Sequence, residues 1–316
     1  MAQPSSDAAA PFQKEKTFSS YNQEQGKAYA LARRNYSPKV YETIIDHHTS
    51  TGGKLDLLLD VGCGPGLAAR SLAPHFTHVV GLDPSDGMLA TARSLGGTTS
   101  GSEPIRYEVS SAEELGANLA PPIADGSVDL ITAANSAHWF DMSGFWPAAA
   151  RVLRPSGSVA MWTSGEIVAD PAMPAAAELD AAIARHREAH LRPYIVPGNM
   201  LTQNRYVDLP LPWTLEKPVQ EFDESAFFRK DWDGSDPFYI GIPEADMDTM
   251  EKMMSTGSPV QRWRDANPDL VGTDRDVLKI LRRDLEEILR KFGAEKGKEK
   301  IRGVVRGAVL IVKKKA

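Results

Sequence analysis

The chain has 316 residues, 42% of them hydrophobic, and a formal net charge of −6. That length and apolar content suffice for one large α/β domain with an inserted part, without disulfide bonds. The single cysteine, Cys63, excludes an internal disulfide and a multi-cysteine zinc site, which favours a reducing, cytoplasmic location. The acidic balance argues against nucleic acid as the main substrate. No apolar run approaches the roughly 20 residues needed to cross a bilayer.

The first two segments differ in character. Residues 1–16 are rich in Ala, Ser, Pro and Gln and have no apolar core, so we expect a disordered leader rather than a signal peptide. Residues 23–45 have helical character, and Tyr29, Arg33 and Tyr36 recur at the spacing of one helix face. From the residues alone, this segment can be a docking helix with arginines at the surface.

The most informative stretch is a strand followed by a glycine-rich turn. Residues 55–61 are mostly apolar, as in a strand buried on both faces of a parallel sheet. Gly62, Gly64 and Gly66 follow and let the backbone turn sharply under a ligand, and a helix is expected over 67–72. A second buried strand over 79–83 ends at Asp83, about 20 residues after Gly62, where dinucleotide-type folds place a ribose-binding acid. The pattern predicts a nucleoside-binding βαβ unit.

The loop favours S-adenosylmethionine (SAM) over a dinucleotide. It lacks the further glycine of a pyrophosphate-binding loop, and Pro65 removes one amide donor. Asp60 would repel a pyrophosphate but suits the ammonium group of SAM, whose ribose diol suits Asp83. A nicotinamide oxidoreductase and a SAM-fold module without catalysis are the rival interpretations.

Further strands are expected over 104–109, 128–133 and 158–163, alternating with helices. Such alternation predicts a doubly wound, Rossmann-like parallel sheet, whose ligands lie beyond the carboxyl ends of the strands. The glycine loop, Asp83, Ser111 and the segment 135–140 all fall at such ends.

These motifs resemble the class I SAM-dependent methyltransferases over residues 20–165: LDVGCGPG at 59–66, GLDPS at 81–85, SAE at 111–113, HWFD at 138–141 and VLRPSG at 152–157. The HWFD motif resembles the fungal branch that contains trans-aconitate 3-methyltransferase. Segments 194–199, 263–264 and 272–276 resemble that branch too. The chain departs from the family pattern at Ser111, where many relatives have an Asp, and at 33–36, where Arg-Pro-x-Tyr-Pro is commoner.

The resemblance implies a seven-stranded, mostly parallel sheet with an antiparallel last strand. It implies SAM as cofactor, with S-adenosylhomocysteine as its product, and a segment that closes over the cofactor. The expected cofactor-binding residues are Tyr29, Arg33, Asp60, Gly62, Cys63, Gly64, Gly66, Asp83, Pro84, Ser111, Ala112 and Asn135.

Outside the core we expect an Ala-rich helical segment over 171–191 and a cap over 193–218, dense in proline and aromatic residues. A sixth strand is expected over 218–222, an amphipathic helix over 274–292 and the last strand over 301–312. The predicted organisation is a leader over 1–16, a SAM-binding core with its N-terminal cover helix over 17–165, a cap over 166–300 and a final core strand over 301–316.

The expected reaction is in-line methyl transfer to a small molecule. A carboxylate acceptor is ionised near neutral pH and requires no general base, whereas a phenol would need a base or a metal. We expect no metal: His186 and His190 are spaced i, i+4, but Arg187 stands where a zinc protease has its Glu.

His138 and Trp139 follow the fourth strand, where the acceptor should meet the methyl group, and are the predicted catalytic pair. The alternative is a capped turn with a buried aromatic ring. A polycarboxylate also calls for arginines. Arg33 is one candidate, and the expected substrate-binding residues in the cap, besides His138, are Arg192, Arg205, Arg229 and Arg264.

The sequence therefore predicts a SAM-dependent O-methyltransferase that forms methyl esters of small di- or tricarboxylic acids such as trans-aconitate. Alternatives are an aromatic carboxylic acid as acceptor and carbon methylation of a quinone-like ring. We expect no nucleic-acid or membrane partner, and a homodimer is compatible with the composition.

Overall fold

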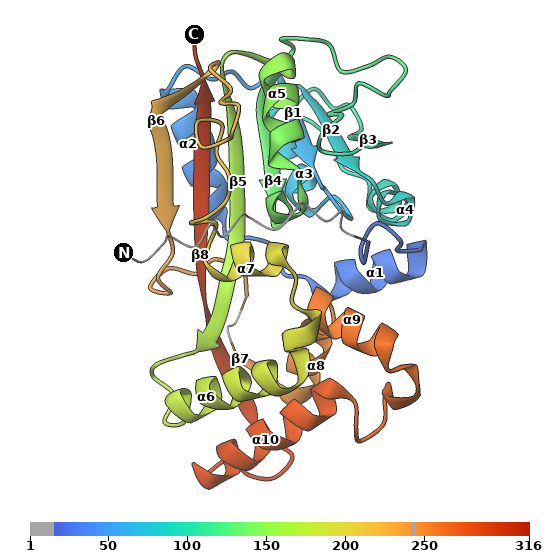
Figure 1. The fold of residues 1–316 in the computed structure, drawn as a ribbon, viewed down its shortest axis with the longest axis vertical. Coiled ribbons are helices and arrows are strands. Elements are labelled where there is room, and N and C mark those ends of the chain that lie inside the picture. The colour runs from blue at the N-terminus through green and yellow to red at the C-terminus, as the bar shows by residue number, and fades with distance from the viewer. Residues whose placement is uncertain (1–15, 242–243) are drawn as a thin grey trace, which may run out of the picture.

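The computed structural model describes residues 16–241 and 244–316. The predicted leader therefore lies, apart from residue 16, outside the described residues. The fold is a twisted sheet with helices on both faces, joined at one end to a helical cap (Figure 1).

Five parallel strands form the centre of the sheet. They are β1 (Leu57–Val61), β2 (His78–Asp83), β3 (Arg106–Val109), β4 (Val128–Ala134) and β5 (Leu153–Ala169). Their order is β3-β2-β1-β4-β5. The chain therefore reverses its direction of winding between β1 and β4, and the carboxyl ends on either side of such a point form the usual ligand crevice.

Two antiparallel pairings complete the sheet. β8 (Lys300–Lys314) runs antiparallel to β5 and to β6 (Phe222–Asp231), so it lies between them. The seven strands in this row confirm the predicted mostly parallel sheet with an antiparallel last strand. An additional short strand, β7 (Glu244–Asp246), pairs with the start of β8. The sixth strand begins at Phe222, where the sequence pattern expected it to end.

Helices cover both faces of the sheet because successive strand residues point to opposite sides. Leu59 and Val61 face a core with Trp146 of α5 (Met142–Val152). Leu58 faces a second core with Ile44 of α2 (Pro38–Ser50). The remaining core helices are α3 (Leu67–Leu72), the 3-10 turns η1 (Ala73–His75) and η2 (Ala137–Trp139), and α4 (Asp86–Leu95).

The helix expected over 23–45 is broken into two. α1 (Gln23–Ala32) begins at a capping box formed by Asn22 and Gln25 and ends before an extended Arg33. It packs on α4 through two glycines: a Cβ on Gly26 would lie 2.7 Å from the Thr91 hydroxyl, and one on Gly87 would lie 2.1 Å from the Tyr21 carbonyl. This close approach holds α1 beside α4 at the ligand edge of the sheet.

The cap consists of short helices around the far ends of β5 and β8. They are α6 (Ala176–His186), the π turn η3 (Arg187–Leu191), η4 (Arg192–Tyr194), α7 (Pro197–Gln203), α8 (Met247–Met254), α9 (Ser258–Ala266), η5 (Pro268–Leu270) and α10 (Val277–Lys291). β5 and β8 are long enough to run from the core into this part (Figure 1). These helices lie within the segment 166–300, which also supplies β6 to the core sheet, and the domain bounds themselves stay a prediction.

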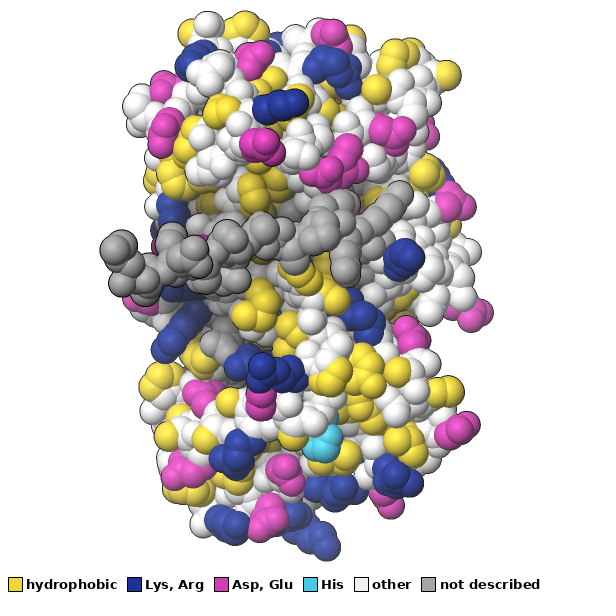
Figure 2. Space-filling model, viewed as in Figure 1, with side chains coloured by type: hydrophobic (Ala, Val, Ile, Leu, Met, Phe, Trp, Pro, Cys, Tyr) yellow, Lys and Arg dark blue, Asp and Glu magenta, His cyan; other side chains and the backbone are white. Residues whose placement is uncertain are grey.

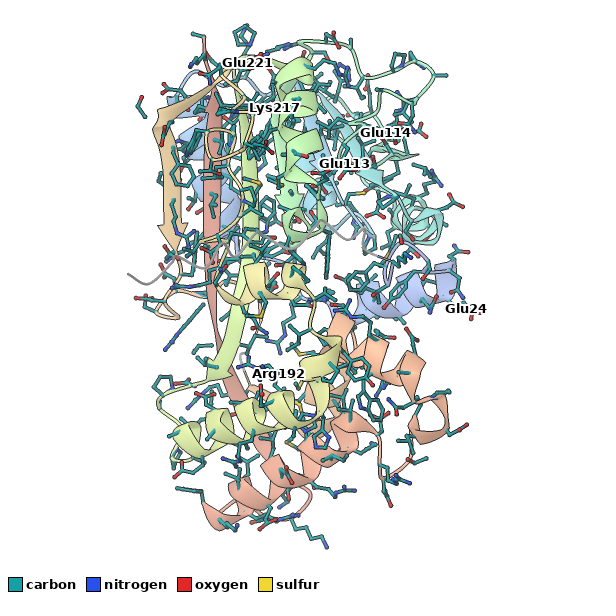
Figure 3. All side chains as sticks on the ribbon, in the orientation of Figure 1. Glu24, Glu113, Glu114, Arg192, Lys217 and Glu221 are labelled. Carbon is teal, nitrogen blue, oxygen red and sulfur yellow. The ribbon has the colours of Figure 1, made fainter. Side chains whose placement is uncertain are left out.

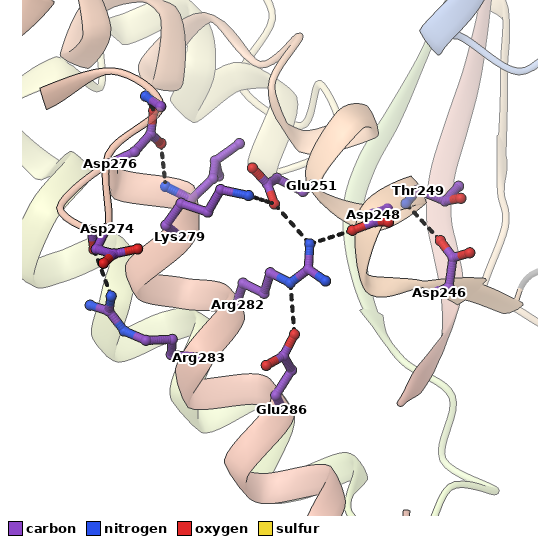
Figure 4. A network of polar contacts seen from close by, with 12 residues as sticks. Asp246, Asp248, Thr249, Glu251, Asp274, Asp276, Lys279, Arg282, Arg283 and Glu286 are labelled. Carbon is purple, nitrogen blue, oxygen red and sulfur yellow. Dashed lines mark hydrogen bonds and ion pairs between the residues drawn. The ribbon is translucent and has the colours of Figure 1, made fainter. Parts of the chain in front are cut away.

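Ion pairs tie the cap helices together. Arg282 of α10 pairs with Asp248 and Glu251 of α8 and with Glu286 one turn further along its own helix (Figure 4). Lys279 adds a second contact to Glu251 at 2.9 Å. Leu281 and Leu285 form the apolar face of α10 against α6 and α8.

Basic and acidic side chains are interspersed over the face of the molecule shown in Figure 2. Within the described part of the chain, every helix is too short or too polar to cross a membrane.

Candidate active site

The glycine loop adopts a backbone that other residues rarely adopt. Gly62, Gly64 and Gly66 all have positive φ, of 63°, 53° and 77°. A Cβ on Gly62 would lie 2.6 Å from the Ser136 side chain, and one on Gly66 would lie 2.4 Å from the Tyr107 hydroxyl. The loop therefore packs closely on Ser136 and Tyr107, and the backbone of Gly62 and Gly64 still lies on a cavity wall where a ligand can bind.

Asp83 closes the loop from the neighbouring strand. Its Oδ2 accepts a hydrogen bond from the Gly64 amide at 2.8 Å, and its Oδ1 accepts one from the Ser85 amide at 2.9 Å. The carboxylate lies on the cavity wall at the end of β2, as the ribose prediction requires.

Asp60 lies beneath the loop rather than on the cavity wall. It is fully buried, its Oδ1 accepts from the Thr132 hydroxyl at 2.7 Å, and its Oδ2 accepts from the Ala69 amide at 3.1 Å. Burial raises the pKa of this carboxyl to about 7, although both hydrogen bonds act in the opposite direction. Asp60 therefore joins β1 to α3, and a contact with the ammonium group of SAM stays a prediction.

The end of β4 forms the opposite wall. Asn135 has a positive φ of 52°, and its side-chain amide reaches the hydroxyls of Ser164 and Tyr239, each at 3.2 Å. Ser136 donates to the Val61 carbonyl at 2.9 Å, which ties this wall to the glycine loop.

An aromatic cover lies over the cavity. The Phe18 ring makes edge contacts with Tyr29 at 5.7 Å and with Trp139 at 6.3 Å. The Arg33 guanidinium lies 4.6 Å from the centre of the Tyr29 ring, and its buried Nε has no hydrogen-bond partner among the described residues. A guanidinium that rests on an aromatic ring and has no acidic partner in the described part of the chain is suited to bind an anionic group of a ligand.

Tyr239 comes to the site from a distant part of the chain. Its ring stacks on Tyr36 at 5.1 Å, and the two residues form an isolated antiparallel bridge. Burial raises the pKa of its phenol, so the hydroxyl is a neutral donor and acceptor at the cavity wall.

These groups enclose one cavity of about 790 Å³, within the range of roughly 300–1,000 Å³ typical of small-molecule sites. Most of the predicted cofactor residues line it: Tyr29, Arg33, Gly62, Cys63, Gly64, Asp83, Pro84, Ser111, Ala112 and Asn135. Gly66 supports the loop from below. The structure also places on the wall residues that the sequence reasoning did not select: Phe18, Lys27, Arg34, Tyr36, Arg70, Glu113, Asp141 and Tyr239.

The two predicted catalytic residues occupy different positions. Trp139 lines the cavity, whereas His138 is absent from the described cavity wall and points to Tyr206, whose hydroxyl lies 2.8 Å from its Nδ1. Burial, with a smaller contribution from the charge of Arg33, lowers the pKa of His138 to about 3. The imidazole is therefore neutral near pH 7 and cannot pair as a cation with a carboxylate.

The four predicted cap arginines are outside the described cavity wall, and each has an acidic partner. Arg192 pairs with Glu188 on an exposed turn among the cap helices, far from Glu113 (Figure 3). Arg205 and Arg229 share one acid, Asp231, at 3.2 and 2.8 Å. Arg264 pairs with the buried Asp276 at the start of α10, at 3.1 Å.

Part of the chain resembles known methyltransferases. Residues 59–161 match the model of a methyltransferase domain. A methyltransferase of Dictyostelium discoideum is 36% identical over 139 residues, which are 44% of this chain and 47% of that protein. A protein of Saccharomyces cerevisiae, named as an S-adenosylmethionine-dependent methyltransferase, is 29% identical over 134 residues, 42% of this chain and 43% of that protein. The alignments thus span about half the length of these relatives.

The segment 59–161 of the chain is therefore similar to a methyltransferase domain. A solved structure of a type II methyltransferase from Anaeromyxobacter dehalogenans shares the fold with a TM-score of 0.56, 22% sequence identity and coverage of 90% of this chain and 97% of that one. The matched segment runs from β1 into β5, so it includes the glycine loop, Asp83 and Trp139.

SAM is the cofactor of this methyltransferase domain, and the cavity suits it. Gly64 offers bare backbone on the cavity wall, since a Cβ there would meet no protein atom within 4 Å, and Asp83 offers an acceptor for a ribose diol. Within the described residues, no group of three or more His, Cys, Asp or Glu side chains is arranged to hold a metal ion.

Proposed function

We propose that the protein is a SAM-dependent O-methyltransferase that forms methyl esters of small di- or tricarboxylic acids, with trans-aconitate as the leading candidate. The observation that carries the proposal is the charge of the cavity that also contains the cofactor cradle. Its basic residues are Lys27, Arg33, Arg34 and Arg70, and its acidic residues are Asp83, Glu113 and Asp141.

The three acidic residues of the cavity already accept hydrogen bonds from the protein backbone. Asp83 accepts two backbone amides, Glu113 accepts the amide of Asp141 at 2.9 Å, and Asp141 accepts the Ser143 amide at the start of α5. By contrast, Lys27 and Arg34 form no ion pair with the described residues. Bound SAM would add a sulfonium, an ammonium and one carboxylate. The cavity then has an excess of positive charge, which an anionic acceptor would balance.

The cofactor's functional groups can be assigned to residues. We assign the ribose to Asp83, the adenine to the wall formed by Pro84, Ser111 and Ala112, and the carboxylate of the methionine part to Arg33. When bound, SAM supplies a methyl group activated by its sulfonium.

The protein's task is then to position the acceptor. A carboxylate is ionised near pH 7, so attack on the methyl carbon needs no general base. The acceptor oxygen has to lie about 3 Å from that carbon, in line with the bond that breaks. Trp139, Phe18 and Tyr239 surround this end of the cavity and exclude water, and the Tyr239 hydroxyl is a neutral donor for the acceptor.

The positions of the arginines favour recognition by α1 and α3 rather than by the cap. Arg34 follows α1 and Arg70 lies in α3, both on the cavity wall. The cap arginines Arg205, Arg229 and Arg264 would have to leave their acidic partners to reach a substrate.

Transfer of a labelled methyl group from SAM tests the proposal. The purified protein is incubated with mono-, di- and tricarboxylic acids, phenols and amines, and products are identified by mass spectrometry. We expect methyl esters of di- or tricarboxylic acids. Arg34→Gln should raise KM for the acid about tenfold, as for the loss of one charged hydrogen bond, while Arg192→Gln should leave it unchanged. Methylation confined to phenols or amines would refute the proposal.

One alternative acceptor has a specific observation in its favour. The cavity wall contains the rings of Phe18, Trp139, Phe140 and Tyr239, which suit an aromatic carboxylic acid. Faster turnover of aromatic monocarboxylates than of trans-aconitate in the same screen would select this acceptor. A product methylated on carbon would indicate the quinone-like alternative.

A further inference from the structure

A strained turn that follows α7 carries an inference that goes beyond the cavity wall. Arg205 and Tyr206 are consecutive residues with positive φ, of 58° and 62°. Residues other than glycine adopt this conformation at a cost of order 1–3 kcal/mol each, and they retain it only where the surroundings enforce it. Tyr206 is nevertheless 1% exposed and lies in the main core.

Several contacts enforce the turn. The Tyr206 amide donates to the Leu201 carbonyl at 2.8 Å. Arg229 of β6 donates to the Arg205 carbonyl at 2.9 Å and to both carboxylate oxygens of Asp231. Arg205 pairs with the same acid. Arg205 and Arg229, both predicted to bind substrate, thus clamp the turn together with Asp231.

The turn directs the Tyr206 hydroxyl at η2. The hydroxyl lies 2.8 Å from His138 Nδ1, which is its one hydrogen-bond partner among the described residues. η2 has no cap from Ser136, whose hydroxyl donates to Val61 instead. The contact between Tyr206 and His138 therefore anchors η2 from outside the turn.

The direction of the hydrogen bond follows from this arrangement. Burial keeps the phenol protonated by raising its pKa, and a buried O–H that did not donate to His138 Nδ1 would have no other acceptor within the described chain. His138 Nδ1 is then an acceptor, so the neutral ring has its proton on Nε2. His138 in turn packs on Trp139, with ring centres 4.5 Å apart, and Trp139 lines the cavity.

We infer that Tyr206 is a positioning residue of the methyl-transfer site: it holds His138 in the Nε2–H tautomer and fixes the η2 turn that presents Trp139 to the cavity. This inference rests on the proposed function only in requiring that methyl transfer occurs at this wall. Tyr206 itself does not touch the cavity in the described part of the chain.

Tyr206→Phe tests the inference, because it removes one oxygen and keeps the ring. Tyr41→Phe is the matched control: its hydroxyl is also held by one side chain, Asn35 at 2.8 Å, in the core, but it does not contact η2. We expect Tyr206→Phe to lower kcat about tenfold with KM for SAM unchanged, and Tyr41→Phe to keep the kcat of the wild type.

Long-range ¹H–¹⁵N NMR of the His138 ring, assigned with His138→Gln, gives a second measurement that needs no turnover. The wild type should show an unprotonated Nδ1, and Tyr206→Phe should shift the ring toward a mixture of tautomers. A protonated Nδ1 in the wild type, or equal kcat in the two Phe variants, would overturn the inference. If no carboxylic acid is methylated, the proposed function fails instead, and the NMR result still decides the tautomer.

Discussion

Asp83 connects the cofactor's ribose site to the glycine loop through the Gly64 amide. Asp83→Ala should therefore weaken S-adenosylhomocysteine binding by the ~1–3 kcal/mol of a lost charged hydrogen bond. Asp86→Ala is a suitable control, because this nearby carboxylate is 80% exposed and its one ion pair with the described residues is with Arg93. Isothermal titration calorimetry measures both, and equal affinities of the two variants would contradict the assignment.

Asp60 makes stability depend on pH. Its pKa in the folded protein is about 7, above its usual value of 3.8, so between these values the folded state retains a proton that the unfolded chain has lost. The contribution of this retained proton to the free energy of unfolding is fully present below about pH 4, and it is lost as the pH rises to about 7. We therefore expect the urea midpoint of Asp60→Asn, relative to wild type, to increase from pH 4 to pH 7. A constant difference between the two proteins would rule this out.

Among the cap helices, Arg282 is the centre of the ion pairs in Figure 4. Arg282 pairs with Glu251 and Glu286, whose side chains are 17% and 20% exposed. Arg282→Met therefore removes a cation from two carboxylates that water solvates poorly. We expect a loss of about 1–2 kcal/mol in the free energy of unfolding. Lys291→Met, which removes an exposed i, i+4 pair with Glu287, should change it by less than about 0.5 kcal/mol. Urea denaturation measures the difference, and similar losses would show that the Arg282 network adds nothing beyond a surface pair.

Local patterns predicted two helices well, one beside the cofactor cavity and one in the cap. The helix expected over 67–72 is α3, and the helix expected over 274–292 is α10, because glycine turns and apolar periodicity are encoded within a few residues. β6 was displaced because its pairing is decided by β8, some 80 residues later in the chain. The helix over 23–45 was broken because Tyr36 pairs with Tyr239.

Side-chain roles in the cap could not be predicted in the same way. An arginine's partner depends on tertiary contacts: Asp231 takes two of the predicted substrate arginines, and Asp276 takes Arg264. Trp139 was placed at the cavity by its position after β4, whereas the orientation of His138 depends on Tyr206, 68 residues away. Tyr239 was missed for the same reason, because its place at the cavity depends on its contact with the distant Tyr36.

At the scale of the whole molecule, the cofactor should couple the N-terminal segment to the sheet. Phe18, Tyr29 and Arg33 line the cavity from the N-terminal segment, and Asp83 and Trp139 line it from the segments at the ends of β2 and β4. A ligand that binds only the folded state at 100 times its Kd adds about 2.7 kcal/mol of stability. We expect S-adenosylhomocysteine to raise the melting temperature and to slow amide hydrogen exchange over residues 17–36. Unchanged exchange in that segment would show that it does not close on the cofactor.

The place of β8 has a consequence for synthesis on the ribosome. β8 lies between β5 and β6, yet the whole segment 170–299 is made after β5 and before it. Until β8 emerges, the edge of β5 has no partner and β6 has no place in the sheet. A nascent chain of this protein therefore carries an open strand edge for most of the time that the cap is being translated, and that edge is where chaperones would be needed.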